Sequence, residues 1–295
     1  METTHTAGKR SASRIAIQVG LFVFAYFFLA GFVCGPLFRW IGGAFAGLTT
    51  AVLVSAGFAS WLCLRAFEDF PVVALGLRWN RASADNLAAG LAGGIGSACL
   101  VLAPPLILGV AHIQFTGPFD WGGMAFTTVF LAVGAIGEEL LCRGYAFQIL
   151  MSRLGPLATV LPTGVLFGLL HAANPHATWF GIANTAGFGM LFGYAYVRSR
   201  DLWLPIGLHF GWNLVLPLFG ANLSGIKIIN EVTGHRMVWT AGELWSGGEY
   251  GPEASVLTTG VLLVVFAFLW KAPIRRQHSP IVDPPKETVC EPSRP

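Results

Sequence analysis

Residues 123–150 read GMAFTTVFLAVGAIGEELLCRGYAFQIL, an apolar run long enough for a membrane span that carries two adjacent glutamates, Glu138 and Glu139. About 20 apolar residues suffice to cross a hydrocarbon core roughly 30 Å thick. A carboxylate at that depth costs roughly 2.5 to 3.5 kcal/mol, so such groups face a protein interior or a hydrated cavity. We therefore expect lipid around this helix and a polar site inside it.

The composition of the whole chain also indicates a membrane protein. Of its 295 residues only 11% are charged and 54% are hydrophobic, and the mean hydropathy is +0.64. Soluble domains carry roughly 25% charged residues, so a soluble globule is excluded. The net charge of +3 comes from short, scattered basic groups between apolar runs, which argues against nucleic-acid binding. The predicted fold class is an all-α membrane protein, a polytopic bundle of about eight transmembrane helices.

Hydropathy and charge together predict the topology. The expected spans are residues 15–34, 41–64, 87–113, 123–150, 157–173, 179–197, 202–219 and 254–270. With the N-terminus in the cytoplasm, fifteen of the 18 basic residues lie inside and only Arg39, Lys227 and Arg236 lie outside. This bias obeys the positive-inside rule and predicts a multi-pass protein of the cell (cytoplasmic) membrane with both termini cytoplasmic.

Three regions outside the spans complete the predicted domain organisation. Residues 1–14 form a cytoplasmic N-terminal segment, and residues 15–272 form the transmembrane domain. Within that domain, residues 220–252 form a long, polar outer loop. The proline-rich tail, residues 273–295, is predicted to be disordered and cytoplasmic.

Polar residues in three different spans are predicted to share one layer. In an antiparallel hairpin turning at residues 154–155, Glu138 and His171 reach the same depth. His209 joins that layer if the hairpin tip, from about Arg143, projects roughly 10 Å from the lipid. Asn213 lies four residues after His209 and shares its helix face. With this projection the fifth span stops short of the outer surface, so residues 172–178 must complete the crossing along an irregular path.

This set of side chains fits hydrolysis. A carboxylate and an imidazole can polarise a shared water for attack on a carbonyl carbon. Donors such as a histidine N–H and an asparagine amide can stabilise the developing oxyanion by roughly 3 to 4 kcal/mol. A structural alternative is an ion pair, because Arg143 follows Glu139 by four residues on the same helix.

Three motifs in order carry a family resemblance: EExxxR at residues 138–143, FxxxH at 167–171 and HxxxN at 209–213. Over about residues 123–219 the chain resembles the CAAX prenyl protease and bacteriocin-processing (CPBP, or ABI) family of intramembrane proteases. The resemblance implies an endopeptidase acting on a membrane-associated protein or peptide. It implies that Glu138 and His171 hold the water and that His209 and Asn213 bind the oxyanion. The implied site also includes three further residues: Glu139 in the catalytic set, and Arg143 and Phe167 in support.

Metal dependence is the question that the resemblance brings with it. Glu138, His171 and His209 would provide three ligands for zinc with a fourth position open. The chain lacks the HExxH helix that places two zinc ligands and a base together. We favour metal-free catalysis, with zinc as the alternative.

Two other classes of protein can use buried Glu and His. A membrane chaperone or bacteriocin-immunity protein would bind a peptide in the same cavity without cutting it. An ion or proton transporter would use the groups as a relay, which requires a polar path through the membrane. We favour the protease because all three motifs are intact.

Overall fold

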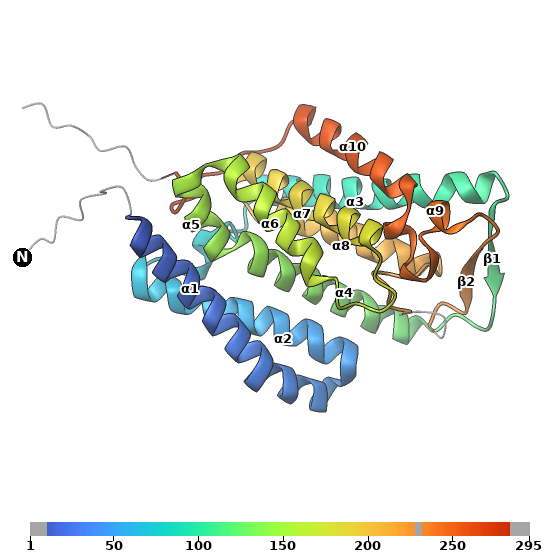
Figure 1. The fold of residues 1–295 in the computed structure, drawn as a ribbon, viewed down its shortest axis with the longest axis horizontal. Coiled ribbons are helices and arrows are strands. Elements are labelled where there is room, and N and C mark those ends of the chain that lie inside the picture. Colours follow the sequence, from blue (N-terminus) through green and yellow to red (C-terminus); the bar gives the residue numbers. More distant parts are fainter. Residues whose placement is uncertain (1–10, 228–231, 284–295) are drawn as a thin grey trace, which may run out of the picture.

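The computed structural model describes residues 11–227 and 232–283, which form a helical bundle with one small sheet (Figure 1). Helix α1 (Ala12–Phe28) continues through a π-helical turn (Leu29–Cys34) into α2 (Gly35–Phe67). Gly43 interrupts α2 with φ 74° and ψ −169°, a conformation open to glycine. The chain reverses there, so α1 and α2 lie side by side as a hairpin.

The remaining helices build the body of the molecule. They are α3 (Arg81–Ile107), α4 (Trp121–Arg143), α5 (Tyr145–Leu154), α6 (Pro156–Leu170), α7 (Trp179–Ser199), α8 (Trp203–Leu218), the short α9 (Glu243–Ser246) and α10 (Val256–Lys271). Strands β1 (Ala111–Phe115) and β2 (His235–Trp239) pair antiparallel, with Ala111 opposite Trp239. The fold class, an all-α membrane protein, is confirmed.

Every predicted span falls on a helix. Within the described residues, three helical stretches are long and apolar enough to cross a membrane: Ala12–Phe67, Arg81–Ile107 and Trp121–Leu154. Two shorter apolar helices there are Pro156–Leu170 and Val256–Lys271. The first stretch contains both helices of the α1–α2 hairpin. The number of crossings and their orientation stay predictions.

Two span boundaries differ from those predicted. The third span ends at Ile107 rather than Ile113, because Pro104 and Pro105 lie near the end of α3 and residues 111–115 pair with β2. Proline removes a backbone donor, so the helix does not continue far beyond it. The first turn lies at Gly43, whereas residues 35–40, expected to be a loop, are helical.

The fourth predicted span is two helices. Gly144, with φ −74° and ψ −133°, separates α4 from α5. The break was not predicted, and the projection of the hairpin tip from the lipid stays a prediction. Helix α6 ends at Leu170, and turns lead to Thr178, whose side chain caps α7. The predicted irregular path of residues 172–178 is confirmed.

The first part of the tail is ordered, contrary to the prediction of disorder from residue 273. Ile281 is 1% exposed, and Gln277 donates to Asp201 and accepts a hydrogen bond from Asn80. Ser279 contacts Gln148 of α5, and Figure 1 shows the segment running from α10 toward α5. Its polar side chains therefore pack against loops and helix ends. Residues 284–295 and 1–10 lie outside the described part of the chain.

Close packing of α3 on α8 fixes the helix that carries His209 and Asn213. A Cβ added at Gly90 would lie 2.4 Å from the Leu204 carbonyl oxygen, and one at Gly94 would lie 2.2 Å from that of Leu208. Only glycine permits this approach of the two backbones. The small-residue pair at 90 and 94 thus positions α8 beside α3.

Candidate active site

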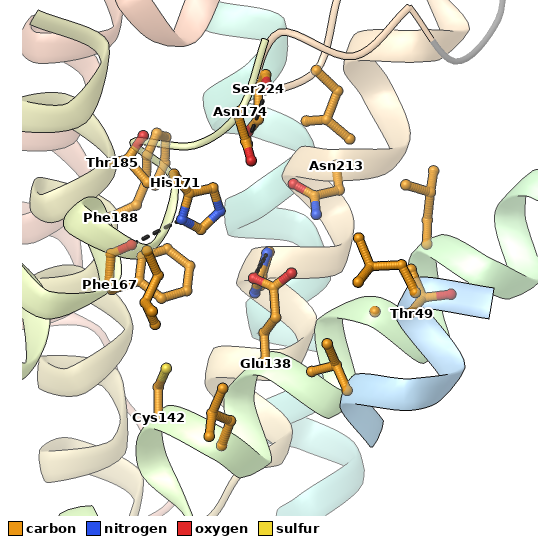
Figure 2. A pocket seen from close by; sticks show the side chains of 18 of the residues that line it. Thr49, Glu138, Cys142, Phe167, His171, Asn174, Thr185, Phe188, Asn213 and Ser224 are labelled. Atoms are coloured by element: carbon orange, nitrogen blue, oxygen red, sulfur yellow. Dashed lines mark hydrogen bonds and ion pairs between the residues drawn. The ribbon is translucent and has the colours of Figure 1, made fainter. Parts of the chain in front are cut away.

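A cavity of about 300 Å³ lies among α2, α4, α6, α7, α8 and the outer loop; we call it the central cavity. Five of the predicted site residues line it: Glu138, Phe167, His171, His209 and Asn213. Figure 2 shows Glu138, His171 and Asn213 facing this space from three different elements. The structure therefore brings together side chains that are up to 75 residues apart in the sequence.

Glu138 presents its carboxylate to the central cavity. Its side chain is 33% exposed. Oxygen Oε2 is buried and accepts no hydrogen bond from the described residues. An uncompensated carboxylate oxygen in such surroundings is costly unless water or substrate reaches it. Its position in the cavity provides that access.

His171 follows the last residue of α6 and faces the same cavity. Its Nδ1 lies 2.8 Å from the Phe167 carbonyl oxygen, a contact drawn in Figure 2. A carbonyl oxygen only accepts, so Nδ1 carries the proton. In neutral His171 the Nε2 lone pair is then free to accept a proton. Phe167, the first residue of FxxxH, fixes the imidazole through its backbone, and the two rings lie 4.8 Å apart.

Glu139 does not line the cavity but supports it from behind. It is fully buried, and its Oε1 accepts from Arg143 at 3.1 Å. The same oxygen lies 2.9 Å from His209 Nδ1. Arg143 also donates to the Gly189 carbonyl at 2.6 Å and lies over the rings of Phe167 and Phe192. The expected i,i+4 ion pair is thus present, and it engages Glu139 rather than Glu138.

His209 stands between the two glutamates. Its Nδ1 faces Glu139, and its Nε2 lies 3.7 Å from Glu138 Oε2. That second distance is too long for a direct hydrogen bond but suits an ion pair or a bridging water. Stacking on Phe192, with ring centroids 4.9 Å apart and planes at 16°, holds the imidazole in place. When protonated, His209 can donate from both nitrogens.

Four polar residues at the end of the central cavity nearest the outer loop were not predicted from the sequence: Asn174, Thr185, Ser224 and Glu253. Asn174 follows His171 by three residues and could have been found by its proximity to FxxxH. Ser224 belongs to the outer loop and Glu253 directly follows it, and because polar residues are ordinary there, no sequence signal marks them. The outer loop thus supplies part of the cavity wall.

Apart from Thr49 of α2, the rest of the cavity wall is mainly apolar. The α1–α2 hairpin contributes Tyr26, Phe27, Phe45, Leu48 and Val52, and α4 contributes Phe130, Leu131 and Leu141. Hydrophobic walls with a few convergent polar groups are typical of ligand sites. The arrangement accommodates an apolar segment beside the polar groups.

The donor set does not form a metal centre. Within the described residues, no group of three or more His, Cys, Asp or Glu side chains is placed to hold a metal ion. The Nδ1 atoms of His171 and His209 contact the Phe167 carbonyl oxygen and Glu139, as is usual for histidines that bind a metal through Nε2. It is therefore the placement of the three side chains, and not these contacts, that disfavours a zinc site.

Fold and site together define a polytopic helical membrane protein with a buried Glu/His/Asn cavity. Residues 120–215 match the model of the family described as Type II CAAX prenyl endopeptidase Rce1-like. The matched segment contains all three motifs. The resemblance to CPBP-family membrane peptidases is confirmed over this segment.

Two proteins of Bacillus subtilis (strain 168) are similar to parts of the chain. "Uncharacterized protein YyaK" is 30% identical over 128 residues, which are 40% of this chain and 42% of YyaK. "Putative membrane peptidase YdiL" is 30% identical over 81 residues, 28% of this chain and 31% of YdiL. The chain thus spans less than half the length of these relatives. No solved structure matches it.

Proposed function

We propose that this protein is an intramembrane endopeptidase of the cell membrane that hydrolyses a peptide bond in a membrane-associated protein or peptide. The observation that carries the proposal is that Glu138 and His171 open into one cavity with His209 and Asn213. The family match supports a peptidase. Apolar walls from the α1–α2 hairpin support a substrate that arrives from, or is anchored in, the lipid.

In this mechanism, Glu138 and His171 Nε2 hold the attacking water. The water oxygen bonds to the scissile carbonyl carbon while one of its protons passes to Glu138. Negative charge then develops on the carbonyl oxygen, and Asn213 together with protonated His209 donates to it. When the C–N bond breaks, the proton held by Glu138 passes to the leaving amine. Glu139 keeps His209 oriented and charged throughout.

In this mechanism no step depends on zinc, and the alternative is a zinc-dependent reaction with Glu138, His171 and His209 as ligands. The measurement that checks this is the zinc content of purified active protein, together with its activity after exhaustive chelation. We expect activity to survive chelation. Stoichiometric zinc with activity lost on chelation and restored by zinc would replace the metal-free mechanism.

The experiment that tests the function compares the termini of membrane proteins in cells carrying the wild type or Glu138→Gln. We expect new N- and C-termini, in matching pairs, with the wild type and none with the variant. Glu249→Gln is the control, because Glu249 pairs with Lys227 at an exposed position of the outer loop, and it should behave as the wild type. Identical termini in all three samples would contradict proteolysis. Co-purification of an uncut peptide would then support the binding protein instead.

A further inference from the structure

Glu253 is a buried acid of the central cavity that none of the three motifs contains. It lies in the short 3-10 helix Pro252–Ala254, just before α10. It is 5% exposed and lines the cavity together with His171 and Asn213. A buried carboxylate must be compensated by hydrogen bonds or charge, so its partners indicate its role.

Both carboxylate oxygens of Glu253 accept hydrogen bonds from residues beside the site. Oε1 accepts from Trp212 Nε1 at 3.2 Å, and Trp212 precedes Asn213 on α8. Oε2 accepts from the Ser224 hydroxyl at 2.8 Å and also from the Ser224 backbone N–H. One side chain therefore joins α8 to the turn Leu223–Ile226, whose backbone closes as an isolated bridge.

Ser224 transmits this contact to the segment that follows His171. Its carbonyl oxygen accepts from Asn174 Nδ2 at 3.1 Å. Ser224 also has a φ of 48°, a left-handed conformation that a serine keeps only when its surroundings impose it. The two hydrogen bonds from Ser224 to Glu253 are contacts able to impose it.

The backbone of Glu253 is itself held firmly. Asn184 of α7 donates to the Glu253 carbonyl oxygen at 2.8 Å and to that of Ser255 at 2.9 Å. Thr258 donates to the Pro252 carbonyl at 2.7 Å. The backbone that carries the Glu253 carboxylate is thus anchored to α7 and α10, so the carboxylate is a fixed acceptor for the turn. The turn is also held by the hydrogen bond from the Gly225 N–H to the Tyr250 carbonyl oxygen at 2.8 Å.

We propose that Glu253 is a positioning residue of the active site, which holds the Leu223–Ile226 turn over the outer end of the central cavity. Through Ser224 and Asn174 it also fixes the segment after His171 relative to α8. Its effect on catalysis rests on the proposed endopeptidase function, whereas its effect on the turn does not. The experiment therefore has one arm that needs no substrate.

The substrate-independent arm measures alkylation of a single cysteine at Leu223, which is 6% exposed. The five native cysteines are replaced, Leu223→Cys is introduced, and the detergent-purified full chain is reacted with a water-soluble maleimide. Glu253→Ala removes all three acceptor contacts, and we expect alkylation about tenfold faster. Glu253→Gln keeps the shape but offers only one acceptor oxygen, so we expect an intermediate rate.

The matched control is a protein whose single cysteine is native Cys63, which is 0% exposed on α2. Its alkylation should not change with either Glu253 variant. If Glu253→Ala accelerates both cysteines, that variant has lost its fold, and Glu253→Gln decides. The proposal would be overturned if Glu253→Gln left alkylation of the cysteine at position 223 as slow as in the protein with Glu253. It would also be overturned if Glu253→Gln accelerated the alkylation of Cys63 as much as that of the cysteine at position 223.

The catalytic arm uses a peptide substrate taken from the cleavage sites identified with the wild type. We expect Glu253→Gln to lower kcat about tenfold with KM within about twofold, since displacement of a catalytic group by an ångström is costly. Glu253→Ala should be slower still. A kcat for Glu253→Gln equal to that of the wild type would also overturn the proposal. Absence of cleavage by the wild type would refute the endopeptidase instead, and alkylation would still test Glu253.

Discussion

Glu138 and Glu139 are adjacent in the sequence but lie in different surroundings, because successive helix residues point about 100° apart. Glu138 reaches the central cavity with 33% of its side chain exposed. Glu139 is fully buried against Arg143 and His209. In the proposed mechanism the two carboxylates therefore have separable roles: Glu138 meets the substrate, and Glu139 holds the His209 imidazole.

Replacing Glu139 tests the supporting role. Glu139→Gln leaves Arg143, which is 1% exposed, without a counter-charge, and removing one partner of a buried pair costs about 3 to 5 kcal/mol. We expect a lower Tm of the purified protein as well as a lower kcat. Asp69→Asn is the control, since Arg65 and Asp69 have the same i,i+4 spacing with side chains 63% and 91% exposed. A Tm shift no larger than that of the control would contradict the structural role.

Asn213 tests the oxyanion assignment. Its side chain faces the central cavity, and loss of one oxyanion donor lowers kcat about 10² to 10³-fold. We expect Asn213→Ala to show a loss of this size with little change in KM or Tm. Steady-state kinetics on the reconstituted protein measure it. A rate near that of the wild type would remove Asn213 from the mechanism.

For single residues, the sequence predicts only those site residues that are polar within an apolar run. Glu138, His171, His209 and Asn213 were found because each lies in a predicted span. Glu253 was not, because an acid in a 30-residue polar loop carries no such signal. Its burial depends on tertiary contacts with Trp212 and Ser224 that no local pattern encodes.

Among the helices, the contact of α3 with α8 has the most direct consequence for the site. A Cβ at Gly94 would lie 2.2 Å from the Leu208 carbonyl oxygen, next to His209. We expect Gly94→Ala to push the helices apart, lowering both Tm and kcat. Gly96→Ala on the same helix has nothing within 4 Å and should leave both unchanged. Equal Tm and kcat values for the two variants would show that the close approach of α3 and α8 at Gly94 does not affect stability or activity.

The loop between α7 and α8 predicts a pH effect on stability. Burial raises the pKa of Asp201 above its ordinary value, although hydrogen bonds from Asn86 and Gln277 oppose the shift. The folded state therefore holds this proton more tightly than the unfolded state, and the group's contribution to stability falls as pH rises through the unfolded and then the folded pKa.

The variant Asp201→Asn isolates that contribution. We expect the Tm of the wild type, measured relative to that of Asp201→Asn, to increase as the pH is lowered from 8 to about 4, the ordinary pKa of an aspartate. Thermal unfolding of both purified proteins across this range is the measurement. A difference in Tm that stays constant or shrinks on acidification would contradict the sign of the pKa shift.

Helix identity could be predicted from hydropathy, but helix ends could not. Apolar runs continue through residues 108–113 and 144–150, where the chain leaves the helix or breaks it. The sequence shows Pro104 and Gly144, but a proline or glycine does not end every helix. Whether it does depends on which hydrogen-bond partners the following residues find in the folded chain. Residues 111–115 pair with residues 235–239, a partner more than a hundred residues away.

Across the whole molecule, the site lies where separate parts of the chain meet. The α1–α2 hairpin supplies apolar walls, the segment matched by the family model supplies the three motifs, and the outer loop closes the far end. A substrate segment in the lipid would therefore contact apolar side chains before it reaches Glu138. The chemistry of such a site requires the assembled bundle rather than any one hairpin.

The most direct test of this account is peptide-bond hydrolysis by the full chain in proteoliposomes, with a membrane-anchored substrate taken from the cellular cleavage sites. The wild type should cut it at one bond, and Glu138→Gln and His171→Ala should each abolish cutting while they remain inserted and keep the wild-type Tm. Cleavage by folded Glu138→Gln at the wild-type rate would contradict the claim that this carboxylate activates the water.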